Sequence, residues 1–476
     1  MYEIKLCSSV SVYEIEELVK MFVPKGKYEI TVDEALDNSQ SFSVVFEKEV
    51  ISRNIEDFYY KGEKPRDSKA LKNAVKRGIF DAFSSSMGRR LPWGILTGVK
   101  PVKIVRELYQ NGMTYDGISG YMKDYYLLND DKTELLLNTL SNQYELSREK
   151  IPGSVGVYLG IPFCPTRCVY CSFTANVAKK GETERYLEAL YKEIEYVSRR
   201  MKDTGLKTES FYIGGGTPTT LDAGQLESLL DRIFGNFDLS SCAEFTVEAG
   251  RPDTITPEKL DVIRKFGIRR ISINPQSMNM KTLEAIGRLH SPEQIREAYE
   301  MARNAGIEVI NMDLIAGLPG ENLEDFKRTL SLVTELEPEN ITIHTLALKR
   351  ASRLKEEDGD FNYREVEKLS QMVDLSREMI DSLGYRPYYL YRQKYMVGNL
   401  ENIGYSKPGA ECIYNIKTMD ERQTMIALGA GGISKRFYPE ENRIERAANV
   451  SNYEIYIDRI DEMIERKEQL IFANSI

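Results

Sequence analysis

Short β-prone runs alternate with amphipathic helical stretches between residues 155 and 346, and this alternation constrains the fold more than any other feature of the chain. Strands that alternate with helices pair in parallel through right-handed crossovers. Six such units are typical of a partial (β/α)6 barrel, in which binding sites lie at the carboxyl ends of the strands. The expected strands are 155–160, 209–213, 244–249, 269–274, 308–315 and 340–346, and the expected helices are 183–202, 222–234, 257–266, 279–306 and 322–336.

The chain on either side of this region has a different character. Residues 1–150 predict a small α+β unit that continues as helices, with an interruption at the Pro- and Gly-containing segment LPWGILTGVKP. Residues 351–476 predict a C-terminal helical extension that covers the substrate, with helices near 363–383 and 452–470. We therefore expect an α/β fold in three parts, 1–150, 151–350 and 351–476, the first without an assigned role.

The composition excludes several classes of protein. The net charge of −9 argues against binding to bulk nucleic acid or to an anionic membrane surface. No apolar run is long enough for a transmembrane helix, and the first residues lack the pattern of a signal peptide. Six cysteines in a chain of 476 residues, three of them clustered, do not predict a disulfide framework, so we expect a cytoplasmic protein in a reducing environment.

Three cysteines follow the first expected strand directly, in the run YLGIPFCPTRCVYC. Cys164, Cys168 and Cys171 have the spacing Cys-x3-Cys-x2-Cys, so a tight loop can aim three thiolates, which are soft ligands suited to iron, at one point. Three thiolates hold three irons of a cubic iron–sulfur cluster, whereas the usual closed site needs four. The fourth iron is then open, which indicates that a small molecule binds the metal directly.

A zinc site and three simply buried cysteines are the alternatives to a cluster. Structural zinc normally takes a fourth protein ligand, and neither His290 nor His344 lies near this loop in the sequence. We assign no role to either histidine. The other cysteines, Cys7, Cys242 and Cys412, are isolated and are expected to be ordinary buried residues.

Glycines and polar residues follow several of the later expected strands. The run GGGTPT at 214–219 follows the second strand, and its glycines let the backbone approach a ligand without a Cβ clash. A carboxylate can bond ribose hydroxyls, and an arginine can clamp a carboxylate. Each such residue taken singly is more often a solvated strand end, but together, at one mouth of a barrel, they favour a site. They are Glu248, Gln276, Arg288 and Asp313.

The ordered motifs YLGIPFC, IGGGTPTTL, TVEA, NPQS, GRLHS and DLIAGLPGE resemble the oxygen-independent coproporphyrinogen III oxidase group of the radical S-adenosylmethionine (SAM) superfamily. LPWGILTGVKPVKIV and PYYLYRQKYMVGNLENIGYSKPG resemble the HemZ-type coproporphyrinogen dehydrogenase branch. The resemblance implies a radical SAM barrel with a [4Fe–4S] cluster and SAM, and a reductant such as flavodoxin or ferredoxin. The implied reaction is the oxidative decarboxylation of coproporphyrinogen III to protoporphyrinogen IX in haem biosynthesis.

The resemblance also implies roles for individual residues. Cys164, Cys168 and Cys171 would ligate the cluster. Tyr158 matches the SAM-site tyrosine, and Ala347 matches a backbone contact to SAM after the last strand. The other implied cofactor contacts are Tyr170, Gly215, Gly216, Thr217, Glu248, Gln276, Arg288 and Asp313.

The sequence departs from the family pattern at three places. The oxidases carry another cysteine where this chain has Phe173, and a histidine where it has Gly160. The haem-chaperone branch carries a His-Asn-x-x-Tyr-Trp element, whereas the comparable stretch here is CIYNIKTMDE, with Tyr414 and Asn415 but no tryptophan. Loss of this element argues against haem transfer, and loss of the cysteine leaves open whether one or two SAM molecules bind.

Two alternative functions remain at this point: a haem-binding or trafficking protein of the same group, and a radical SAM methyltransferase that acts on a tetrapyrrole or a heteroaromatic ring. For a substrate with four carboxylates we expect cations at the mouth, although ordinary surface charge is as plausible for them. A group of tyrosines is expected either to form an aromatic wall or to pack in the core. The cations are Lys349, Arg350, Arg392 and Lys394, and the tyrosines are Tyr385, Tyr388, Tyr389, Tyr391 and Tyr395.

Overall fold

The computed structural model describes residues 1–476 except 8–9, 37–40, 47–48, 64–66, 149–150, 172–175, 348–365, 394–399 and 474–476. The chain forms two compact units. The N-terminal unit comprises Met1–Leu140, Asp360–Glu367 and Tyr391–Leu400, and the barrel unit comprises Ser141–Gly359, Lys368–Leu390 and Glu401–Ile476. The roles predicted for the three segments of the sequence stay predictions.

The N-terminal unit contains a four-stranded sheet in the order β2-β1-β3-β4. β1 pairs in parallel with β2 and antiparallel with β3, so α1 connects the parallel pair. Phe22 on α1 stacks on Phe83 and meets Phe80 edge to face, both on α2, and the three rings form part of the core of this unit. The elements are β1 (Tyr2–Leu6), α1 (Val12–Phe22), β2 (Tyr28–Val32), β3 (Ser41–Phe46), β4 (Glu49–Asn54), α2 (Ser68–Met87), α3 (Pro101–Gln110), α4 (Tyr115–Tyr125) and α5 (Asp130–Arg148), the last of which ends in the barrel unit.

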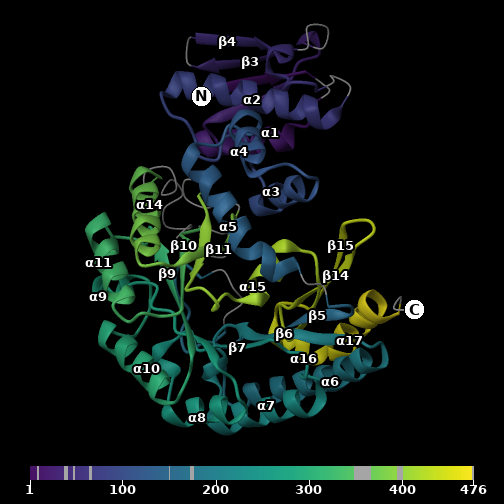
Figure 1. Ribbon diagram of the computed structural model, residues 1–476, viewed down its shortest axis with the longest axis vertical. Coiled ribbons are helices and arrows are strands. Elements are labelled where there is room, and N and C mark those ends of the chain that lie inside the picture. Colours follow the sequence, from purple (N-terminus) through teal and green to yellow (C-terminus); the bar gives the residue numbers. More distant parts are fainter. Residues whose placement is uncertain are drawn as a thin grey trace. The chain divides into compact units, whose positions relative to one another are not determined.

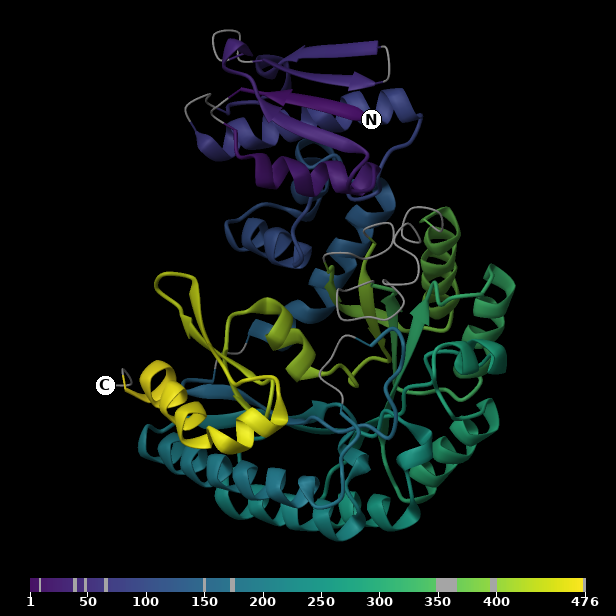
Figure 2. The same cartoon turned by 180° about the vertical axis from the view of Figure 1, so that it is seen from behind.

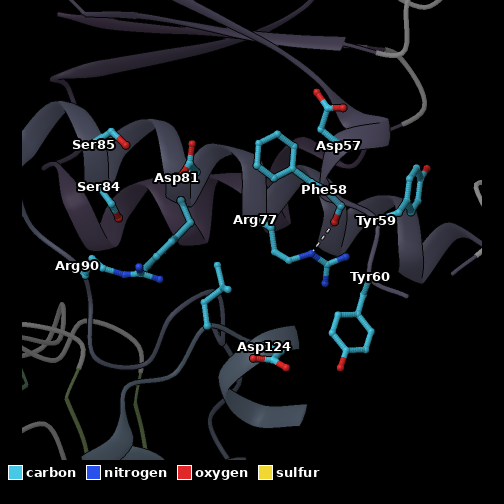
Figure 3. A pocket seen from close by; sticks show the side chains of 12 residues that line it. Asp57, Phe58, Tyr59, Tyr60, Arg77, Asp81, Ser84, Ser85, Arg90 and Asp124 are labelled. Atoms are coloured by element: carbon cyan, nitrogen blue, oxygen red, sulfur yellow. Dashed lines mark hydrogen bonds between the residues drawn. The ribbon is translucent and has the colours of Figure 1, made fainter. Parts of the chain in front are cut away.

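The predicted α+β unit followed by helices is confirmed, with turns at residues 92–95 inside the predicted interruption. A pocket of about 420 Å3 lies in this unit, beside the 3-10 turn Ile55–Phe58 and α2 (Figure 3). Arg77 lines the pocket, and its Nε donates to the Phe58 carbonyl over 2.7 Å while Nη2 donates to Glu63 over 2.6 Å. The charge of this buried arginine is therefore compensated within the unit.

The barrel unit is built on one sheet of eleven strands in the described residues, in the order β11-β12-β10-β9-β8-β7-β6-β5-β13-β14-β15. Six consecutive neighbours, β5 to β10, are parallel, and each coincides with one of the predicted strands. Because the sheet has two ends and does not close, it is a partial barrel, as predicted. The parallel strands are β5 (Ser154–Ile161), β6 (Lys207–Gly215), β7 (Glu244–Glu248), β8 (Arg270–Ser272), β9 (Val309–Ala316) and β10 (Asn340–Thr345).

Amphipathic helices cover the convex side of this sheet (Figure 1). The single helix predicted at 279–306 is wrong, because the structure has two helices there. Ser291 caps the second helix by accepting a hydrogen bond from the Gln294 N–H, and Pro292 cannot donate to a preceding turn, so residues 286–291 leave the helical path. The helices are α6 (Glu182–Asp203), α7 (Ala223–Asn236), α8 (Pro257–Lys265), α9 (Met280–Ala285), α10 (Pro292–Asn304) and α11 (Leu323–Thr334).

The C-terminal region is not purely helical, which corrects the predicted helical extension. Five strands extend the two ends of the sheet, and charged sequences such as Arg443–Ala448 pair as strands because neighbouring backbone fixes them, not because their side chains favour it. The strands are β11 (Arg386–Tyr391), β12 (Asn402–Ser406), β13 (Thr424–Leu428), β14 (Ile433–Tyr438) and β15 (Arg443–Ala448), and the helices are α14 (Val366–Ser382), α15 (Ile413–Asp420), α16 (Tyr453–Asp458) and α17 (Ile460–Lys467).

Helix α15 lies on the concave side of the sheet, opposite the covering helices (Figures 1 and 2). Glu244 at the start of β7 holds its first turn, because its carboxylate accepts the N–H groups of Ile413 over 2.9 Å and Tyr414 over 3.2 Å. A carboxylate at a helix N-terminus is favourable both as a cap and against the helix dipole. This contact places Tyr414 inside the barrel.

Candidate cofactor site at the barrel mouth

The cysteine loop starts directly after β5 and is tied down by backbone hydrogen bonds. The Cys164 N–H donates to Asn176 over 2.9 Å, and the Val169 N–H donates to Ile286 over 3.1 Å, in the break between α9 and α10. Cys168 is 8% exposed, while Cys164 and Cys171 are half-buried. The loop thus carries all three thiols at the carboxyl end of the first barrel strand, as predicted. Phe173 lies outside the described residues.

The donor set suits iron, because free thiols are soft ligands once they lose their protons. Burial raises the pKa of Cys164 to about 11, while a hydrogen bond with Thr217 works in the opposite direction. In the part of the chain that the structure describes, no three His, Cys, Asp or Glu side chains are placed to hold a single metal ion. A four-iron cluster instead takes one thiolate per iron.

The glycine-rich turn after β6 packs against the start of the cysteine loop. The Gly216 N–H donates to Ile161 and the Thr217 N–H donates to Phe163, each over 2.7 Å. A Cβ on Gly216 would collide with the Phe163 carbonyl oxygen, and Gly215 has a φ of +112°, which disfavours any other residue. These two N–H groups are therefore used within the protein, and contact of this turn with SAM stays a prediction.

Replacing Gly216 with alanine is expected to misplace the cysteine loop, because the added methyl group meets rigid backbone at Phe163. We expect iron content after anaerobic reconstitution to fall by at least about half, on the scale of damage that an overpacked site causes. Gly235→Ala in α7 is the matched control, because nothing lies within 4 Å of its added Cβ. Equal iron content in the two variants would contradict this role of Gly216.

Half-buried polar side chains from successive strands line the concave side of the barrel. Tyr158 on β5 lies opposite Tyr212 on β6, and their rings stack with the ring of Tyr414. The Tyr212 hydroxyl donates to Glu248 over 2.6 Å. On the other side, Asp313 on β9 lies 3.6 Å from Nε2 of His344 on β10. Glu248 and Asp313 therefore share one interior, as the strand-end prediction required.

Burial sets the ionisation of this interior. It raises the pKa of Glu248 to about 7, the charge of Asp313 adds to the rise, and the Tyr212 hydroxyl partly offsets it. Burial also opposes ionisation of Asp313, but hydrogen bonds and charge from His344, together with Asn311, hold its pKa below the usual value. Two carboxylates with separated pKa values thus face the same interior, which is typical of functional sites.

Gln276 carries two marks of a binding residue. Its φ of +67° is unusual for a residue other than glycine, and its side chain is 7% exposed. Its amide oxygen has no hydrogen-bond partner in the described residues. Buried polar atoms without partners are rare in proteins, so this oxygen fits a ligand group or an ordered water. Ala347 is half-buried just after β10.

The guanidinium of Arg288 connects three loops through hydrogen bonds. Its Nη1 donates to Gly250 over 3.0 Å and to Asn274 over 3.1 Å, and Nη2 donates to the Tyr170 hydroxyl over 3.2 Å. The residue therefore holds Tyr170 of the cysteine loop against the loops that follow β7 and β8. Its Nε has no partner in the described residues, so a contact with a SAM carboxylate stays a prediction.

Of the residues expected around the substrate, those that the structure describes are mostly buried. Arg392 is 2% exposed in the N-terminal unit, with its guanidinium 4.8 Å from the centre of the Trp93 ring, because this cation packs on an aromatic face. Of the tyrosines, Tyr385, Tyr388 and Tyr389 are buried, which agrees with packing in the core, and Tyr391 is half-buried. Lys349, Arg350, Lys394 and Tyr395 lie outside the described residues.

Three contributors to the interior were not identified as site residues in the sequence, namely Tyr212, Tyr414 and His344, which lies beside Asp313. Tyr212 precedes the glycine-rich turn by two residues, and strand alternation from Tyr158 could have indicated its inward direction. Tyr414 gave no local signal, because its place depends on the capping of α15 by Glu244.

The chain is similar to one protein family and to several individual proteins. The model of the radical SAM superfamily matches residues 158–333. The oxygen-independent coproporphyrinogen-III oxidase-like protein HemZ of Bacillus subtilis (strain 168) is 40% identical over 411 residues, which cover 84% of this chain and 82% of that protein. The heme chaperone HemW of Escherichia coli (strain K12) is 28% identical over 61% of this chain and 72% of its own length.

Among solved structures, the radical SAM enzyme coproporphyrinogen III oxidase (HemN) from Escherichia coli aligns with a TM-score of 0.52 at 24% identity. The alignment covers 65% of this chain and 70% of that one. This likeness supports the partial-barrel fold. No helix in the described ranges has both the length and the apolar character needed to span a membrane.

Proposed function

Because this chain belongs to the radical SAM superfamily, and within it to the family of the oxidase-like HemZ protein, we propose that it decarboxylates coproporphyrinogen III to protoporphyrinogen IX without oxygen. The cofactors of the superfamily are a [4Fe–4S] cluster and SAM. The observation that carries the proposal is the 40% identity over 84% of the chain, combined with the cysteine loop at the mouth of the barrel.

We assign cluster ligation to Cys164, Cys168 and Cys171, which leaves one iron for SAM. When bound, the cofactors supply an electron and a carbon-centred radical that removes a hydrogen atom from the substrate. Glu248 and Asp313 line the interior from β7 and β9, and when ionised they would accept hydrogen bonds from the ribose hydroxyls of bound SAM. Tyr158, Gln276 and the loops held by Arg288 complete the proposed SAM site. The reductant is proposed to be a flavodoxin or a ferredoxin.

A haem-binding function is the second candidate, favoured by the similarity to heme chaperone HemW. The side chain of Tyr414, in the stretch that lacks the chaperone's His-Asn-x-x-Tyr-Trp pattern, stacks at a centroid distance of 4.5 Å on Tyr212. This ring therefore packs inside the barrel against a residue that touches Glu248. A haem titration followed at the Soret band separates the two candidates, because only a chaperone is expected to bind haem stoichiometrically.

The reconstituted protein is expected to convert coproporphyrinogen III in the presence of dithionite and SAM under anaerobic conditions. Mass spectrometry should detect the loss of two CO2 units from the porphyrinogen, and chromatography should detect 5′-deoxyadenosine. Omission of SAM is the control. SAM cleavage with an unchanged porphyrinogen would reject this substrate and keep the superfamily assignment, whereas S-adenosylhomocysteine and a methylated product would favour a methyltransferase.

A further inference from the structure

Thr217 occupies a position from which its hydroxyl reaches a cluster ligand. Its Oγ1 lies 3.4 Å from Sγ of Cys164, and the side chain is 1% exposed. The main chain of Thr217 is fixed on both sides, because its N–H donates to Phe163 over 2.7 Å and its carbonyl accepts the Thr220 hydroxyl over 2.7 Å. Among the described bonds, Sγ of Cys164 is the partner of this hydroxyl, and the fixed backbone keeps the hydroxyl beside it.

We propose that Thr217 is a positioning residue that donates a hydrogen bond to the Cys164 sulfur and thereby raises the reduction potential of the cluster. The inference rests on the ligation by Cys164 proposed above, but not on the identity of the substrate. A ligating sulfur carries no proton, so the hydroxyl must be the donor once the cluster is bound. This direction makes the bond charge-assisted and stronger than the bond between a thiol and a hydroxyl.

The effect on the potential follows from charge. Reduction adds one electron to the cluster and its thiolates, so a donor aimed at a sulfur stabilises the reduced form more than the oxidised form. Hydrogen-bond donors to the ligands of a metal change its properties without binding the metal themselves. Arg251 also supports the cysteine loop, because its Nη1 donates to the Thr166 hydroxyl over 2.8 Å. Unlike Thr217, it makes no hydrogen bond with Cys164 among the described bonds.

This role differs from a contact between the hydroxyl and SAM, which the family resemblance implies for this turn. The two roles separate experimentally, because the potential of the cluster can be measured without SAM. A hydroxyl that serves SAM alone would leave that potential unchanged, and a hydroxyl that serves Cys164 would change it.

The test is an anaerobic redox titration of the full-length reconstituted protein, followed by the EPR signal of the reduced cluster. Thr217→Val keeps the shape and removes the donor, and its midpoint potential is expected to be more negative than that of the wild type. Thr217→Ser restores a hydroxyl and is expected to return most of the shift.

Each outcome decides the proposal. A negative shift in the valine variant that serine reverses supports it, and an unchanged or more positive potential overturns it. If Thr217→Val does not assemble the cluster, Thr217→Ala provides the same comparison with less crowding, and the D2O sensitivity of the iron–cysteine stretching bands tests the donor in the wild type itself. A wild-type protein without an EPR signal of a [4Fe–4S] cluster would instead refute the proposed function.

Discussion

Replacing Cys168 with alanine is expected to abolish cluster assembly and with it SAM cleavage. Cys168 is the middle cysteine of the loop and is 8% exposed, so no other thiol can take its place without moving the loop. Loss of one of three thiolates leaves two irons of the cluster without protein ligands, and such a cluster is not retained. Iron content should fall from about four per chain to less than about one, and 5′-deoxyadenosine should fall to the background of a sample without protein.

The measurement is iron and sulfide analysis after anaerobic reconstitution, together with the visible absorption of the cluster. Cys242→Ala is the matched control, because Cys242 is also partly buried but lies outside the loop and donates only to the Glu244 carbonyl among the described bonds. We expect the control to retain iron and activity. Circular dichroism of both variants shows whether the fold survives, which separates loss of ligation from unfolding.

Two outcomes would contradict the cluster. Iron retained at full level in Cys168→Ala would mean that this thiol is not a ligand. Zinc in the wild type after anaerobic purification, with one ion per chain lost in the variant, would favour the zinc alternative, in which the three thiols need a fourth ligand.

The parallel strands of the barrel were predictable because each is a short apolar run between amphipathic helices. β9 (Val309–Ala316), for example, alternates buried apolar residues with half-buried residues that face the interior, among them Asp313. The sequence also contains the signal for the break between α9 and α10, which is the capping pattern of Ser291, Pro292 and Gln294. The helical periodicity on both sides of this pattern led to the prediction of one long helix. β14 and β15 could not be predicted from the sequence, because they carry many charged side chains and lack an apolar pattern. They form strands because their backbones pair with each other at the edge of the sheet.

The same distinction between local sequence patterns and tertiary packing applies to the residues of the site. The spacing of Cys164, Cys168 and Cys171 is local information, so the sequence alone placed them on one loop after a strand. The pair Tyr212–Glu248 depends on the register of β6 and β7, and the stacking of Tyr414 depends on a cap that joins residues far apart in the chain. Such contacts follow from tertiary packing, and no local pattern predicts them.

The affinity for SAM is expected to rise about tenfold between pH 6 and pH 8 through Glu248. The pKa of this carboxyl is raised to about 7, mainly by burial. A carboxylate accepts two ribose hydroxyls, whereas the protonated acid loses part of this capacity. If only the ionised form binds, the population of the acid weakens binding about elevenfold at pH 6 and almost not at all at pH 8. The sign is fixed, because a group that must lose a proton favours binding at higher pH.

Comparison of variants isolates the contribution of Glu248 from that of the ligand, whose own amino group titrates in a similar range. Glu248→Gln cannot ionise, so its affinity should be lower and the rise that remains should be that of the ligand alone. Tyr212→Phe removes the hydroxyl that donates to Glu248 over 2.6 Å, so the pKa of Glu248 should increase and the profile should move to higher pH. Glu258→Gln, an exposed glutamate on α8, is the control and should follow the wild type.

The measurement is the dissociation constant of SAM by isothermal titration at several pH values with the cluster oxidised, so that no cleavage occurs. Asp313, Tyr158 and His344 face the same interior, and the lowered pKa of Asp313 keeps that group ionised throughout this range. A profile of Glu248→Gln that matches the wild type in steepness would show that the carboxyl does not titrate during binding. A steeper rise in the wild type than in Glu248→Gln, displaced to higher pH in Tyr212→Phe, would show that the Tyr212–Glu248 hydrogen bond lowers the pKa of this carboxyl and so enlarges its ionised fraction at neutral pH.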